Sequence, residues 1–95
     1  MKNVYTMSGE VWIYPSEHAA WHFVHIPQTI ANKIRKVNTT ASVRVVVTVG
    51  ETEWNTSLFW HAKSQTYILP LKADIRRREG IEAGEQITFT LSVCA

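Results

Sequence analysis

This chain of 95 residues contains a single cysteine and no long apolar run. Cys94 has no partner for a disulfide within the chain, so nothing indicates an oxidising compartment. No apolar stretch approaches the length of a membrane-spanning helix, and residues 1–9 contain no signal-peptide core. We therefore expect a cytoplasmic protein that does not contact a membrane.

Charge is also scarce. Charged residues make up 19% of the chain and the net charge is +2. Dedicated nucleic-acid-binding domains have a clear basic excess, so this composition alone does not indicate one. The hydrophobic fraction of 45%, which includes four tryptophans, can supply one core in a chain of this length. We predict a single domain over residues 1–95.

Alternation of apolar and polar residues dominates the sequence and predicts strands rather than helices. The clearest strand is β-branched at almost every position, with Val43, Val45, Val47 and Val49 on one face. The pattern predicts six strands, at residues 9–14, 20–26, 43–49, 54–60, 65–71 and 86–93.

Two short helices interrupt the strands. Pro27 suits the first turn of a helix over residues 28–37, in which Ile30, Ile34 and Val37 form one apolar stripe. A second helix is predicted over residues 75–79, with Asp74 as its N-cap and Gly80 as its end.

Strands with one buried face and one solvent-exposed face argue against a parallel α/β sheet. Six short strands of this kind can close into a barrel, which removes exposed sheet edges. We predict a mainly β fold, a small closed barrel of about six strands with two short helices. A two-sheet sandwich is the alternative.

Several segments resemble a bacterial family, the domain-of-unknown-function family 1905. They are Trp21-His-Phe-Val-His-Ile-Pro27, Trp54-Asn-Thr-Ser-Leu-Phe-Trp60, Tyr67-Ile-Leu-Pro-Leu-Lys-Ala73, Arg76 and Gly80-Ile-Glu-Ala-Gly-Glu85. The resemblance implies a small barrel of the cradle-loop type, with no established activity and hence no catalytic residues to transfer. Gly84-Glu85 is similar to the Gly-Asp turn of such barrels, with Glu in place of Asp.

A basic cluster is the first candidate site. Lys72 and Arg76 lie one helical turn apart, and Ser57 on a nearby strand adds a hydroxyl. Together these residues could hold a phosphate, a carboxylate or a protein partner. The alternative is a solvated cationic surface in which Lys72 or Arg76 pairs with a neighbouring carboxylate.

The second candidate is a nucleic-acid patch, which requires both helices to lie at one end of the barrel. Its six cations are Lys33, Arg35, Lys36, Arg76, Arg77 and Arg78. The glutamates that follow directly, at positions 79, 82 and 85, dilute such a patch. Nucleic acid is therefore the less favoured partner.

The sequence predicts neither a metal site nor a cofactor. The histidines are His18, His22, His25 and His61. His18 and His22 would share a face only on a helix, whereas on the predicted strand His22 and His25 point to opposite faces. Zinc needs three or four ligands, and the only cysteine is close to the end of the sequence. Ser57 and Cys94 are the candidate nucleophiles, but neither lies in a nucleophile-elbow motif. An enzyme is the least favoured alternative.

Aromatic residues exceed the needs of a minimal core. Trp12 and Tyr14 lie on the face opposite Val11 and Ile13, so one of these pairs must be on the outside of the first strand. We expect Trp12 and Tyr14 to form a contact surface. Together these features predict a non-catalytic binding or interaction module whose partner is a protein or a small anion.

Overall fold

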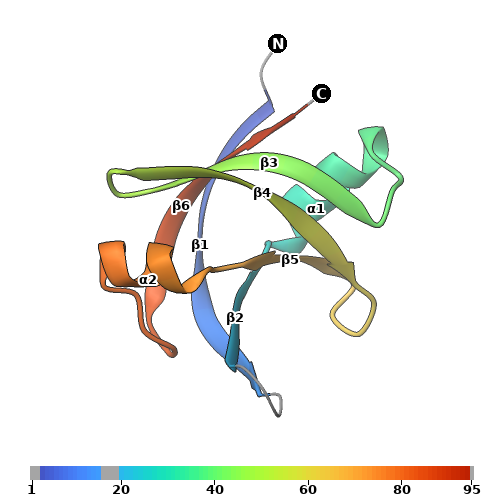
Figure 1. Ribbon diagram of the computed structural model, residues 1–95. Coiled ribbons are helices and arrows are strands. Elements are labelled where there is room, and N and C mark those ends of the chain that lie inside the picture. The colour runs from blue at the N-terminus through green and yellow to red at the C-terminus, as the bar shows by residue number, and fades with distance from the viewer. Residues whose placement is uncertain (1–2, 16–19, 95) are drawn as a thin grey trace.

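The computed structural model describes residues 3–15 and 20–94, and six strands and two helices lie within these ranges (Figure 1). The elements are β1 (Asn3–Pro15), β2 (Ala20–His25), α1 (Gln28–Val37), β3 (Ser42–Val49), β4 (Thr52–His61), β5 (Thr66–Pro70), α2 (Ala73–Glu79) and β6 (Gln86–Val93).

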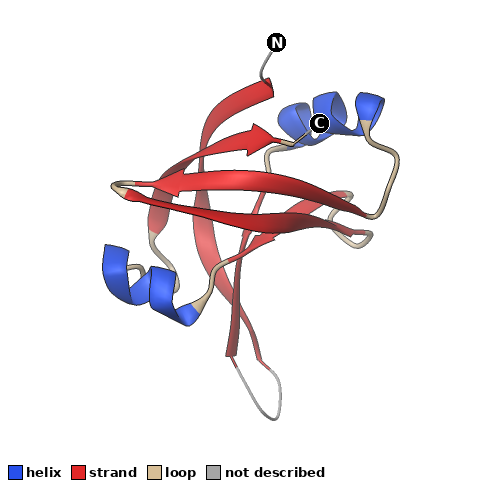
Figure 2. Ribbon diagram, turned by 45° about the horizontal axis from the view of Figure 1, so that its top comes forward, coloured by secondary structure: helices blue, strands red, loops and turns tan. Residues whose placement is uncertain are grey.

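The strands form a closed barrel, with the helices outside it (Figure 2). Their order is β1-β2-β5-β4-β3-β6, and every neighbouring pair is antiparallel. The predicted fold class is thus confirmed. Closure gives each strand an inner face and an outer face, as its alternating sequence requires. The inner faces of β3 and β6 carry Val43, Val45, Val47, Phe89 and Leu91, which are at most 3% exposed.

Strand β1 is longer than the sequence predicted, because it begins at Asn3 rather than at Gly9. Residues 3–10 pair with β6 and residues 11–15 pair with β2, so β1 belongs to two different ladders. Gly9 lies where one ladder gives way to the other. A Cβ on Gly9 would lie only 2.6 Å from Cγ1 of Val24 on β2, so glycine permits the close approach of these strands.

Helix α1 has the predicted bounds, and Pro27 precedes its first residue as the N-cap. Its buried residues are Ala31 and Ile34, which pack into the barrel core. The predicted apolar stripe is wrong at its end, because Val37 is 70% exposed. Val37 is the last helical residue, and Asn38 already has extended backbone.

Helix α2 begins at Ala73, two residues earlier than predicted. Lys72 is its N-cap residue, and Asp74 lies in the first turn without a side-chain capping bond, so the predicted cap was wrong. The predicted end is confirmed: Gly80 has a φ of 63°, and the N–H of Ile81 donates to the carbonyl of Arg76.

The turn at Gly84 and Glu85 joins α2 to β6. A carboxylate oxygen of Glu85 accepts the backbone N–H of Glu82 over 2.7 Å, so the longer acid still bonds a turn amide. The same turn exchanges two backbone hydrogen bonds with Val11 of β1. Within the described residues, no helix is long and apolar enough to cross a membrane.

Candidate binding groove

Aromatic side chains gather on the outside of the barrel, where β1, β2, β5 and β4 are neighbours. The register pairs Tyr14 with Trp21, Trp12 with Phe23, Phe23 with Pro70, and Phe59 with Ile68. Paired residues of antiparallel strands point to the same side of a sheet. We call this surface the aromatic face, and its members are Trp12, Tyr14, Trp21, Phe23, Phe59, Ile68 and Pro70.

The rings of the aromatic face contact one another. The centroids of Trp12 and Phe23 are 5.1 Å apart, and Trp21 stacks on Phe23 at 6.5 Å. Much of this surface is nevertheless in contact with water, since Tyr14 is 58%, Trp21 54% and Phe59 46% exposed. Exposed aromatic groups clustered in this way mark contact surfaces more often than solitary ones do.

The face is hollowed into a groove of about 520 Å³. Aromatic and aliphatic side chains dominate its lining, together with Thr56 of β4 and Lys72. A second hollow of about 270 Å³ adjoins it and includes His22, Lys72 and Arg76. Trp21 and Lys72 line both hollows, so the apolar groove ends at two cationic side chains.

Local structure fixes Lys72 and Arg76 at this end. Lys72 is exposed and precedes α2, and Arg76 lies one turn further along the helix. Nε of Arg76 donates to the carbonyl of Leu71 over 3.2 Å, and Nη1 lies 3.5 Å from Nε2 of His22. The guanidinium is therefore held in place beside the exposed side chain of Lys72.

Ser57, the third predicted anion-site residue, lies on β4 opposite Arg44 of β3. Its side chain is half-buried. Lys72 and Arg76 line one hollow together, but Ser57 does not line that hollow or the groove. The structure thus brings together two of the three residues, and the neighbouring Thr56 supplies the polar group from β4.

Comparison with known proteins places the chain in a family. The sequence profile described as a domain of unknown function (DUF1905) matches residues 8–91. The chain belongs to this family. No curated protein matches it. The DUF1905 match contains the whole aromatic face together with Lys72 and Arg76.

The far end of the groove in this DUF1905 chain contains histidine. A hollow of about 280 Å³ is lined by Trp12, Tyr14, Phe23, His61 and Ile68. His25 stacks on Trp12 at 5.0 Å, and its ring lies 5.9 Å from that of His61. Burial, and to a smaller extent the nearby His61, lower the pKa of His25 below the usual 6.5.

The histidines do not assemble with further ligands in the described part of the chain. Residues 3–15 and 20–94 contain no group of three or more His, Cys, Asp or Glu that could hold a metal ion. His18 lies outside the described residues. Nδ1 of His61 instead lies 2.6 Å from the hydroxyl of Ser64, which orients the ring toward the β4–β5 turn.

The cations of the nucleic-acid alternative fall into two groups. Helices α1 and α2 lie on opposite sides of the barrel in both ribbon views (Figures 1 and 2), so Lys33, Arg35 and Lys36 are remote from residues 76–78. Arg35 also lies over the ring of Trp60, 4.0 Å from its centroid. The condition that both helices share one end is not met.

Sequence reasoning identified Trp12, Tyr14 and Lys72 but missed the rest of the groove. Trp21 and Phe23 are two positions apart on β2, and Phe59 is next to Trp60 on β4, so alternation assigns the phase of each along its strand. These phases were the available signal. The missing information was that β2, β5 and β4 are consecutive in the barrel, which places these side chains next to Tyr14.

Proposed function

We propose that this protein is a non-catalytic interaction module of the bacterial cytoplasm, and that the aromatic groove is its binding surface. The observation that carries the proposal is that Trp21 and Lys72 line both the apolar groove and the hollow at Arg76. A ligand that fills the groove therefore reaches two cations at one end. The lone cysteine is the support for a cytoplasmic location.

The ligand we propose is a protein segment that combines apolar side chains with a carboxylate. Apolar side chains displace water from Trp21, Phe23 and Phe59, each of which offers a large area of contact. A carboxylate at the end of the segment neutralises Lys72 and Arg76, and this charge complementarity favours an acidic segment over a basic one. Buried aromatic anchors surrounded by a polar rim are typical of protein interfaces.

Calorimetric titration with two capped peptides tests this function. Both alternate leucine with threonine; one ends in glutamate and the other in glutamine. We expect the glutamate peptide to bind more tightly at low salt, because only its carboxylate attracts Lys72 and Arg76. The fold-difference between the peptides should shrink as salt is added.

Matched variants locate the binding surface. We expect Trp21→Ala to weaken binding of the glutamate peptide by about tenfold or more, as for an interface anchor. Lys72→Gln should bring the two peptides close to equal affinity. Val37→Ser and Lys63→Gln are the controls, because both residues are exposed and neither lines the groove.

Binding that is unaffected by Trp21→Ala would overturn the proposal. So would tight binding of a DNA duplex with a steep loss of affinity between low and moderate salt, since that is the behaviour of a nucleic-acid binder that uses the arginines of α2.

A further inference from the structure

Strand β4 has a strand partner along only part of one edge. It pairs with β3 from Thr52 to Phe59, but with β5 only from Phe59 to His61. From residue 52 to residue 58, the edge of β4 that faces away from β3 therefore has no ladder with another described strand. Figure 1 shows β4 and β5 diverging from this point toward α2.

Pro70 explains why the β4–β5 ladder stops. Continuing the register from Phe59 and Ile68 by two residues places Pro70 opposite Ser57. Proline has no N–H, so it cannot donate to the carbonyl of Ser57. Two residues later, the chain leaves the sheet. The carbonyl of Lys72 accepts a 3.0 Å hydrogen bond from the N–H of Arg76 in the first turn of α2.

The backbone groups of alternate residues on this edge point away from β3. Arg44 of β3 is the partner of Ser57, and its carbonyl accepts a hydrogen bond from the N–H of Cys94, on the side of β3 away from β4. The N–H of Trp60, by contrast, donates to the carbonyl of Ala41. Even-numbered residues of β4 thus bond toward β3, and odd-numbered residues point the other way. Glu53 and Asn55 present their N–H and C=O groups at the free edge, and Ser57 presents its C=O.

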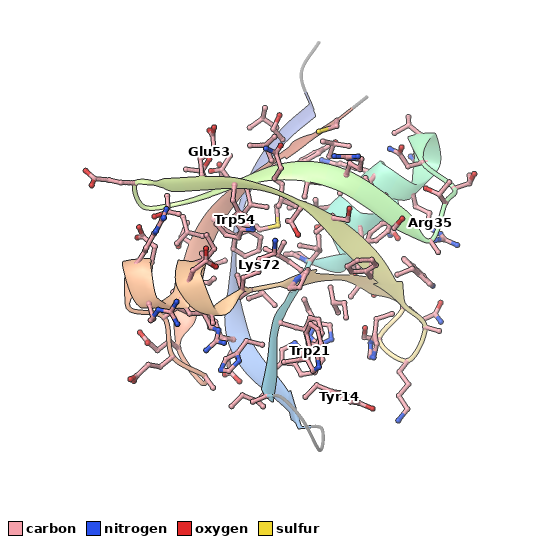
Figure 3. All side chains as sticks on the ribbon, in the orientation of Figure 1. Tyr14, Trp21, Arg35, Glu53, Trp54 and Lys72 are labelled. Atoms are coloured by element: carbon pink, nitrogen blue, oxygen red, sulfur yellow. The ribbon has the colours of Figure 1, made fainter. Side chains whose placement is uncertain are left out.

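The free edge runs beside the groove. Thr56 of β4 lines the groove together with Pro70 and Lys72 of the diverging chain. In Figure 3, Trp54 and Lys72 lie in the space between β4 and the start of α2. An unpaired strand edge next to apolar pockets is the arrangement in which peptides bind by adding a strand to a sheet.

We infer that the partner segment binds in an extended conformation and hydrogen-bonds to the free edge of β4 in the place that β5 leaves. This inference rests on the proposed function. Residues 53–57 offer about 17 Å of edge at roughly 3.4 Å per residue, which is enough for about five residues of the partner. Its alternate side chains enter the groove, and its carboxylate reaches Lys72.

Backbone methylation of the peptide tests the strand pairing without altering the protein. The glutamate peptide is compared with a copy that has N-methyl groups on alternate amides. Side chains and charge are unchanged, but the methylated edge can neither donate hydrogen bonds nor approach β4. We expect methylation on the β4-facing edge to weaken binding by about tenfold or more. Methylation on the other edge should cause a smaller loss of affinity, with a logarithm less than half as large.

Amide hydrogen exchange provides a second measurement on the unmodified protein. The N–H groups of Glu53 and Asn55 should exchange at least tenfold more slowly when the peptide saturates the protein. The N–H of Lys36, on the exposed face of α1, is the control and should not change.

The outcomes separate the two proposals. Equal binding of parent and methylated peptides, with both sensitive to Trp21→Ala, would refute strand addition and leave the groove as the binding surface. Failure of the parent peptide to bind would refute the proposed function and the strand addition with it.

Discussion

The hydroxyl of Thr52 donates a 2.5 Å hydrogen bond to a carboxylate oxygen of Glu79 and so joins the β3–β4 hairpin to the end of α2. The other carboxylate oxygen of Glu79 lies against Gly50, where a Cβ would collide with it. Helix α2, which carries Arg76 and follows Lys72, is therefore anchored at its far end to the turn that begins β4.

Replacing Thr52 by valine should destabilise the protein. Thr52→Val keeps the β-branched shape but removes the donor, and Thr52 is only 9% exposed. We expect the free energy of unfolding to fall by about 1–3 kcal/mol, because a partly buried carboxylate loses a hydrogen bond. Urea denaturation measures the change. Thr29→Val, on the exposed face of α1, is the control, and equal midpoints for the two variants would contradict the prediction.

Alanine at Gly9 should strain the crossing of β1 and β2. The new Cβ would lie 2.6 Å from Cγ1 of Val24, which is fully buried and cannot move freely. We expect Gly9→Ala to cost about 1–3 kcal/mol, as for overpacking of a core. A double-mutant cycle with Val24→Ala checks the cause. The second substitution removes the colliding methyl group, so the penalty of Gly9→Ala should be smaller in that background; simple additivity would refute the clash.

The guanidinium of Arg35 should stabilise the end of the barrel that α1 covers. It lies 4.0 Å from the centroid of Trp60, and Trp60 in turn makes an edge contact with Tyr67 of the core. Arg35→Met keeps the long apolar stem and removes the charge. We expect a loss of about 0.5–1 kcal/mol in thermal or chemical denaturation. Lys36→Met on the same helix is the matched control, and a loss of the same size there would contradict the assignment.

The stability of the protein should fall in mild acid. Burial lowers the pKa of His25, so the folded state binds this proton less readily than the unfolded state, whose pKa is about 6.5. The contribution of neutral His25 to the free energy of unfolding is therefore fully present above pH 6.5. It is lost as the pH falls from that value through the lower pKa of the folded state. Denaturation at several pH values should show a smaller acid loss for His25→Gln than for the unaltered chain. An identical pH dependence would refute the assignment.

The strength of the sequence pattern decided how much of the fold could be predicted. Residues 28–37 and 86–93 were placed with the observed bounds, since each combines clear periodicity with a signal directly before it, Pro27 for the helix and the Gly84-Glu85 turn for the strand. The first strand was placed too late, because Ser8 and Thr6 are polar on the outer face and only pairing with β6 shows that they belong to a strand.

The groove was harder to predict than the fold. Tyr14, Phe59 and Pro70 are far apart in the sequence and meet only because the strand order is β1-β2-β5-β4. Alternation indicates which side chains share a face of one strand, but it does not indicate which strands are neighbours. The end of the β4–β5 ladder depends on the same information, because Pro70 matters only once its register against Ser57 is known.

Closure of the barrel joins the earliest and the latest strands of the chain. The hydroxyls of Thr6 on β1 and Thr90 on β6 lie 3.2 Å apart although 84 positions separate them in the sequence. Loops of this length cost entropy to close, and folds that depend on distant pairings form slowly. Strand β6 lies between β1 and β3 in the barrel and is the last of the three in the sequence. Until β6 pairs with both neighbours, β1 and β3 each keep one unpaired edge, so the barrel closes only with the last of its six strands.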